Sequence, residues 1–288
     1  MAGKGSRFRP PANTPVDRPR LRGHDSSTRV TDPDHQRHDP LQALRQPNFA
    51  IYAVGRLLAT VAMTLLNASI AWQVYEISGS AFQLAMLGLA RFVPSLGLSL
   101  VGGAFADSHD RRRIVMAAQT IPLLCSATLF LATINGFTEL PLFYGLVLLI
   151  ALAAAFENPA RQALLPQVVS KAAFQNAIIV SSTIQSLGFV TGPAVGGLLI
   201  GFFGVDSSYA VHMALIAGSL AGLSVLRTAP AEGARRAVSF AAIKEGVQFV
   251  THRQVLLGAM TLDMFTVIFG GATALLPVVA KDILEVGP

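Results

Sequence analysis

Residues 102–113 read GGAFADSHDRRR and lie between two long apolar runs, residues 80–105 and 114–134. The first residues of this stretch are small or apolar, whereas the last seven include five charged side chains. A charged turn between two apolar runs is typical of two membrane-spanning helices joined by a loop in water. Because successive spanning helices alternate in direction, the side of the membrane that this turn faces determines the side of every other loop.

Composition supports lipid as the solvent of the folded chain. Hydrophobic residues make up 52% of the sequence and charged residues 13%, with a mean hydropathy of +0.53. A soluble domain carries roughly a quarter charged residues. The net charge of +6 comes largely from tails and loops. Because these form neither a folded basic face nor an aromatic platform, we expect no nucleic-acid partner.

Seven apolar runs have the length that a bilayer core of about 30 Å requires. They span residues 49–74, 82–105, 114–134, 142–156, 174–203, 209–226 and 255–279. The fourth run is short unless its helix continues through residues 157–161. Backbone polar groups cannot face lipid unpaired, so we expect an all-α integral membrane fold.

The distribution of Lys and Arg predicts the orientation of these helices. One side receives the basic N-terminal tail, residues 111–113, Lys171 and a basic linker, whereas short loops on the other side carry Glu76, Glu139 and Asp206. Basic loops face the cytoplasm. We therefore expect a multi-pass plasma-membrane protein with a cytoplasmic N-terminus.

Two polar segments flank the first six runs. Residues 1–40 lack apolar periodicity, which predicts a disordered cytoplasmic tail, although an over-extended reading frame is an equal alternative. Residues 228–253 form a cytoplasmic linker. Within it Phe240, Ile243, Val247 and Val250 recur at helical spacing, which fits either an amphipathic helix on the membrane or a solvated linker helix.

Two motifs carry a resemblance to a known family. The pattern G-x-x-x-D-x-x-x-R-R at Gly103, Asp107, Arg111 and Arg112 resembles the motif between helices two and three of the major facilitator superfamily. The fifth run contains a second match, similar to the helix-five motif of that superfamily's proton-coupled exporters. It consists of Gly188, Gly192, Pro193, Gly196 and Gly197.

Finer features resemble the branch that contains the enterobactin exporter and macrolide efflux pumps. They include Asn158, Pro159 and Arg161 after Glu157 at the end of the fourth run. The chain departs from the usual first motif, with Ser108 and Asp110 where a basic residue and a glycine are common. Asp110 could instead pair with the neighbouring arginines.

The resemblance implies twelve helices in two six-helix halves. Residues 41–227 would form the N-terminal bundle and residues 254–288 the first helix of the second bundle. The expectation is therefore a fragment whose partner is the missing C-terminal half, with the substrate site between halves near the midplane.

Individual residues admit functional and structural readings. Asp107 would brace a gate between halves, or the arginines after it only enforce topology. The glycines and Pro193 of helix five would limit proton leak, or only pack. Arg91, about ten residues into its helix, would meet an anionic substrate or a carboxylate partner. Asp263 is the candidate for proton coupling, and Glu157 a weaker one that could simply pair with Arg161.

These features predict a secondary transporter that exports small amphipathic molecules in exchange for protons. Its energy source would be the proton gradient, with no cofactor or metal, because the six His and the single Cys125 lack metal-ligand spacing. Its partners would be the lipid bilayer and a small-molecule substrate. An enzyme, a seven-helix receptor, and an inert or partner-dependent truncated chain are the alternatives.

Overall fold

The computed structural model describes residues 42–226, together with residues 228, 253, 254, 257, 258, 261, 262 and 278–283. All of them belong to one compact unit, Asp39–Pro288. The predicted tail at residues 1–40, the amphipathic segment of the linker and Asp263 lie outside the described residues. Those expectations therefore stay predictions.

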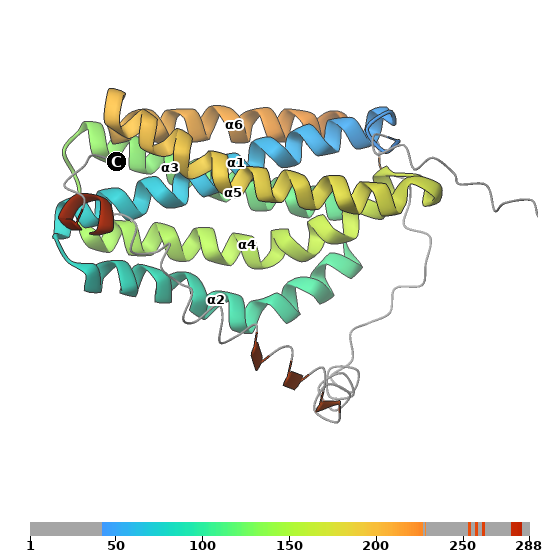
Figure 1. Ribbon diagram of the computed structural model, residues 1–288, viewed down its shortest axis with the longest axis horizontal. Helices are drawn as coiled ribbons and strands as arrows, with labels where there is room; N and C mark the ends of the chain where they lie inside the picture. The colour runs from blue at the N-terminus through green and yellow to red at the C-terminus, as the bar shows by residue number, and fades with distance from the viewer. Residues whose placement is uncertain are drawn as a thin grey trace, which may run out of the picture. The chain divides into compact units, whose positions relative to one another are not determined.

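Each of the first six apolar runs forms one continuous α-helix (Figure 1). The helices are α1 (Pro47–Ser78), α2 (Ala81–Ser108), α3 (Arg111–Ile134), α4 (Leu140–Val168), α5 (Phe174–Phe203) and α6 (Val205–Val225). A 3-10 turn, η1 (Lys171–Ala173), precedes α5, and a single π-helical turn, η3 (Val279–Ile283), lies near the C-terminus. In the described residues the fold is all-helical, as the sequence predicts.

The helix boundaries follow from local chemistry. Gly79 ends α1 at φ 58°, a left-handed conformation that glycine adopts without steric cost, and its N–H donates to the Tyr75 carbonyl. Asp110 begins α3 by accepting hydrogen bonds from the backbone N–H groups of Arg112 and Arg113. α4 runs through Pro159 to Val168, which confirms that the short fourth run continues past residue 161.

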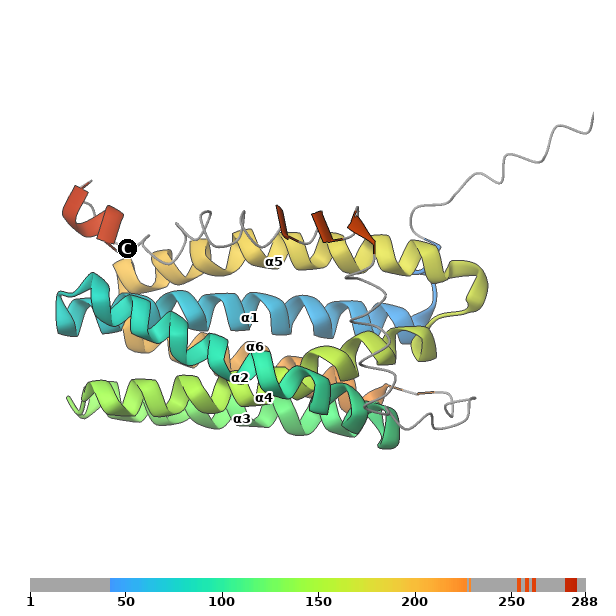
Figure 2. The same cartoon turned by 90° about the horizontal axis from the view of Figure 1, so that it is seen from below.

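The order of the helices in space differs from their order in the chain. α1 lies between α5 and α6, α3 packs against α4 and α6, and α2 runs along α4 (Figures 1 and 2). The two helices with the most extensive contacts, α1 and α4, therefore connect the other four.

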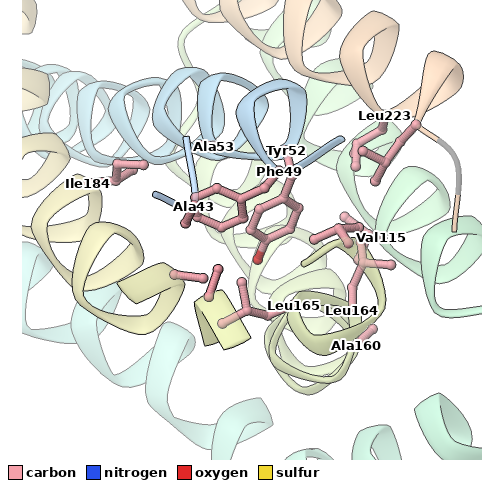
Figure 3. Packing of buried hydrophobic residues seen from close by; sticks show 14 of the residues in the cluster. Ala43, Phe49, Tyr52, Ala53, Val115, Ala160, Leu164, Leu165, Ile184 and Leu223 are labelled. Carbon is pink, nitrogen blue, oxygen red and sulfur yellow. The ribbon is translucent and has the colours of Figure 1, made fainter. Parts of the chain in front are cut away.

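Apolar side chains fill the bundle near the end where α1 begins and α4 ends. Phe49 and Tyr52 project from α1 toward α4, beside Leu164 and Leu165 (Figure 3). A second apolar cluster near the other end includes Leu66, Ile70, Leu129, Phe143 and Val147.

The outward surface of the helices is also apolar. Val190, Phe202 and Phe203 on α5 are each more than 70% exposed, and comparable side chains stand out on the other helices. A water-soluble protein rarely exposes so much contiguous apolar surface, whereas lipid accommodates it. Five described helices (α1, α3, α4, α5 with η1, and α6) are long and apolar enough to cross a membrane, and the described apolar part of α2, Ala81–Phe92, is shorter.

Candidate functional site

A stripe of polar side chains runs along one face of α1. It consists of Arg56, Thr60, Thr64 and Asn67, all partly exposed. At 3.6 residues per turn, positions 56 and 67 are separated by about three full turns and share one side of the helix. Near Arg56 this face borders α5, and near Asn67 it borders α2.

Arg56 is held in place by two neutral side chains. Its Nη1 donates to the Tyr52 hydroxyl at 3.2 Å, and its Nη2 donates to Gln185 Oε1 on α5 at 2.9 Å. Tyr52 in turn donates to the Arg161 carbonyl of α4 at 3.4 Å. Arg56 therefore links α1 to α5 directly and to α4 through Tyr52.

Arg91 lies on α2 and faces the other end of the stripe. Its Nη2 is 3.5 Å from the Asn67 carbonyl oxygen, which is long for a hydrogen bond. The structure thus brings Arg91 to α1, where it contacts a neutral acceptor. Within the described ranges, Asn67 contributes its backbone oxygen and not its side chain.

The helix-five glycines form the contact between α5 and α1. A Cβ at Gly188 would lie 2.9 Å from Thr60 Cβ, and a Cβ at Gly192 would overlap Thr64 Oγ1 and lie 2.8 Å from the Val61 carbonyl. Thr64 uses the close approach to donate to the Gly188 carbonyl at 2.8 Å. The packing interpretation of this motif is therefore supported by direct contact.

The remaining residues of the helix-five motif are less tightly enclosed. Gly196 is buried against Leu65, with a Cβ position 3.6 Å from its Cγ. Gly197 is partly exposed. α5 remains one helix through Pro193, which is also partly exposed.

A polar chain of buried, hydrogen-bonded side chains lies beside the C-terminal part of α4. Glu157 accepts from Gln119 Nε2 of α3 at 3.0 Å and forms an ion pair with Arg161, with side chains only 10% and 12% exposed. Gln119 also accepts from Ser219 of α6 at 3.1 Å. The pairing of Glu157 with Arg161 is confirmed, and it lies inside the bundle. Hydrogen bonds through Gln119 connect this pair on α4 to α3 and α6.

Asn158 and Pro159 take no part in this polar chain. Asn158 is exposed and Pro159 is partly exposed within α4. Among the residues of this segment, the structure brings only Glu157 and Arg161 together.

The charged turn between α2 and α3 is attached to the rest of the bundle by its arginines. Arg111 donates to the Ala163 carbonyl of α4 at 3.1 Å, and Arg112 donates to the Ser224 carbonyl in the last turn of α6. A cation at a helix C-terminus also interacts favourably with the helix dipole. These two arginines therefore position the turn against α4 and α6.

The other residues of the turn are in different settings. Asp110 pairs with Arg113 at 3.5 Å, as the sequence suggested. Gly103 is partly exposed, and a Cβ there would meet no atom within 4 Å in the described part of the chain. The side chain of Asp107 lies outside the described residues.

Sequence reasoning missed several residues of these networks. Gln119, Gln185 and Ser219 are polar residues inside apolar runs, which is the signal that could have singled them out. The same signal marks His212 and Ser126, fully buried and hydrogen-bonded across α6 and α3 at 2.8 Å. Gln73 of α1 also joins two other helices, since it accepts from Tyr209 and donates to Thr133.

No group of three or more His, Cys, Asp or Glu side chains able to hold a metal ion occurs in the ranges the structure describes. The chemistry available at the α1 stripe is therefore that of arginines, hydroxyls and amides. Such groups bind and orient a polar molecule.

The family model of transmembrane secretion effectors matches residues 38–288. The chain belongs to this family of the major facilitator superfamily. The match covers all six described helices and confirms the resemblance drawn from the two glycine motifs. The chain is accordingly a multi-pass membrane protein.

Curated relatives of this secretion-effector chain are efflux and transport proteins by name. It is 29% identical over 204 residues to the multidrug efflux pump Tap of Mycolicibacterium fortuitum, covering 67% of this chain and 49% of Tap. It is 26% identical to macrolide efflux protein A of Streptococcus pyogenes, covering 57% and 40%. A staphyloferrin A transporter of Staphylococcus aureus is 29% identical over 48% of this chain and 35% of its own length. The chain thus spans about half, or less, of the length of these relatives.

Proposed function

We propose that this protein acts in secondary active transport, exporting small amphipathic molecules of the drug or siderophore type in exchange for protons. The observation that carries the proposal is the polar stripe of α1, with Arg91 beside it, in a bundle whose outer surface is apolar. Polar and charged groups within a membrane helix are costly and commonly mark a substrate or ion path. The names of the relatives support the same class of function.

The proposed mechanism is alternating access, in which two six-helix halves rock around a site near the membrane midplane. The six described helices would form one half, with the α1 stripe facing the site. The close α1–α5 contact at Gly188 and Gly192 would keep that half rigid during rocking. The remaining six helices would be supplied by the C-terminal half that the family resemblance implies.

Three roles of the charged groups belong to this proposal. Asp107 would brace the cytoplasmic contact between halves, Asp263 would carry the coupled proton, and the basic loops would face the cytoplasm. Arg111 and Arg112 support the first role because they hold the turn against α4 and α6. A gate element must be rigidly mounted to transmit force.

Replacing Asp107 by Asn tests the gate. In a chain that carries both halves, D107N is expected to reduce proton-driven uptake into inverted membrane vesicles at least about tenfold, as loss of a charged bond of about 1.5–3 kcal/mol implies. Membrane insertion should be unchanged. The matched control is D110N, which keeps a side-chain oxygen at the N-cap of α3.

Two results would count against the proposal. Unchanged transport in D107N would show that Asp107 does not form a gate, and it would leave the proposed transport function intact. Absence of any proton-dependent flux of amphipathic compounds in the parent vesicles would defeat the proposed function itself.

A further inference from the structure

The charges inside the described helices do not balance. Away from helix ends, the charged side chains are Arg56, Arg91, Glu157 and Arg161. Glu157 and Arg161 pair with each other. Arg56 and Arg91 have no carboxylate partner among the described residues, so two positive charges remain.

Within the described residues, both arginines are oriented by neutral groups, which do not cancel their charge. Arg56 is fixed by the Tyr52 hydroxyl and the Gln185 amide oxygen, and its Nε is buried with no hydrogen-bond partner in the described part of the chain. In the described part of the chain, Arg91 makes its hydrogen bond to a backbone carbonyl. A guanidinium has five N–H donors, so each retains donors for a further acceptor.

The Arg56 guanidinium is fixed by contacts to two helices. Its Nη1 donates to Tyr52, one turn nearer the beginning of α1, and its Nη2 donates to Gln185 of α5. These two side chains therefore set its position.

The two arginines also lie along the same polar stripe. Arg56 belongs to it, and Arg91 meets it at Asn67, about 16 Å further along α1. Thr60 and Thr64 lie between them and pack against Gly188 and Gly192 of α5. The two guanidiniums are therefore two separate sites for an acidic group, one on each side of this close contact.

We propose that Arg56, held by Tyr52 and Gln185, is an anion-binding station that acts with Arg91, and that the transported molecule is an amphiphile bearing an acidic group. This inference rests on the proposed transport function and specifies its substrate class. A guanidinium binds a carboxylate through two parallel hydrogen bonds, which favours an acidic cargo over a neutral or cationic one. Arg91 receives the same acidic group deeper in the membrane.

Binding of three matched probes tests the charge preference. They share a pyrene body and differ in charge: 1-pyrenebutyrate, 1-pyrenebutanol and a pyrenebutyl trimethylammonium ion. The full chain is placed in nanodiscs of neutral phosphatidylcholine, and affinity is read from pyrene fluorescence. The butyrate is expected to bind at least about tenfold more tightly than the alcohol, and the ammonium probe most weakly.

Substitutions locate the preference. R56Q and R91Q are each expected to weaken butyrate binding about tenfold and to leave the alcohol unchanged, and R56K should retain part of the preference. The matched control is R113Q, because Arg113 has a side chain that is 86% exposed at the charged turn. Equal binding of butyrate and alcohol, or no effect of R56Q, would overturn the proposal. Weaker binding of both probes in R56Q would show a structural role and overturn it as well.

Two further arms separate the alternatives. Loss of butyrate binding when about a third of the lipid is phosphatidylglycerol would assign the station to lipid head groups and overturn the cargo assignment. Flux of the ammonium probe that is insensitive to R56Q and R91Q would leave the transport function intact and remove the anion station. Tight butyrate binding without flux in a chain with both halves would support the anion station and defeat the proposed transport function.

Discussion

At Gly192 the space for a side chain is determined by a neighbouring helix more than a hundred residues away in the chain. The Val61 carbonyl and the Thr64 side chain of α1 occupy the volume that a Cβ would need. Backbone atoms cannot move aside as a flexible side chain can. The glycine is therefore required by packing, whichever transport role the motif also has.

Gly192→Ala is expected to destabilise the bundle by about 1–3 kcal/mol, the usual cost of overpacking. The effect should appear as a lower midpoint of thermal unfolding in detergent. Gly145→Ala on α4 is the control, since a Cβ there meets nothing within 4 Å in the described chain and alanine favours a helix. Equal midpoints for the two variants would contradict the close packing of α5 on α1.

At the scale of elements, the buried chain of Ser219, Gln119, Glu157 and Arg161 ties α6, α3 and α4 together. Tyr52 extends the connection to α1 through the Arg161 carbonyl. A buried ion pair costs desolvation energy, and its loss on one side leaves an uncompensated charge in a poorly hydrated place. The pair should therefore behave as a unit.

The single substitutions Glu157→Gln and Arg161→Gln are each expected to cost about 3–5 kcal/mol of stability. The double substitution should cost clearly less than the sum of the two, because it leaves no unpaired charge. Thermal unfolding of the four proteins in a double-mutant cycle measures this coupling. Additive effects would show that the two charges do not depend on each other.

At the scale of the whole molecule, the bundle has an apolar exterior and two chemically different ends. Exposed Lys171 and Arg113 lie at the end where α3 begins and α4 ends, and exposed Glu76 and Glu139 lie at the other. The excess of cations at the first end predicts that it faces the cytoplasm. This asymmetry follows from the order of the loops along the chain and does not depend on how the helices pack.

Cysteine labelling checks the orientation. In a Cys125→Ala background, a membrane-impermeant maleimide applied to intact cells is expected to label E139C and to spare K171C. Both positions should be labelled after permeabilisation, since both parent side chains are exposed. Cys125 is buried, so its removal should cost little beyond a small cavity. The opposite labelling pattern would invert the proposed topology.

Six helices, the family, and the approximate ends of the helices other than α4 are determined by the sequence alone, whereas α4 runs to Val168, well past its apolar run. The reason is that a bilayer imposes length and hydropathy on each segment separately, so these properties are local. The pairing of Glu157 with Arg161 is local as well, because residues four apart share a helix face.

Only the tertiary structure decided which helix faces meet. In lipid the outer and inner faces of a helix are both apolar, so hydropathy does not distinguish them, and close packing and polar contacts between distant segments decide instead. That is why the placement of Gly192 against Thr64, of Gln119 against Glu157, and of Arg56 against Gln185 had to come from the fold. The charged turn at residues 102–113 shows both levels: its sequence indicates a loop in water, whereas its attachment to α4 and α6 through Arg111 and Arg112 is a property of the packed bundle.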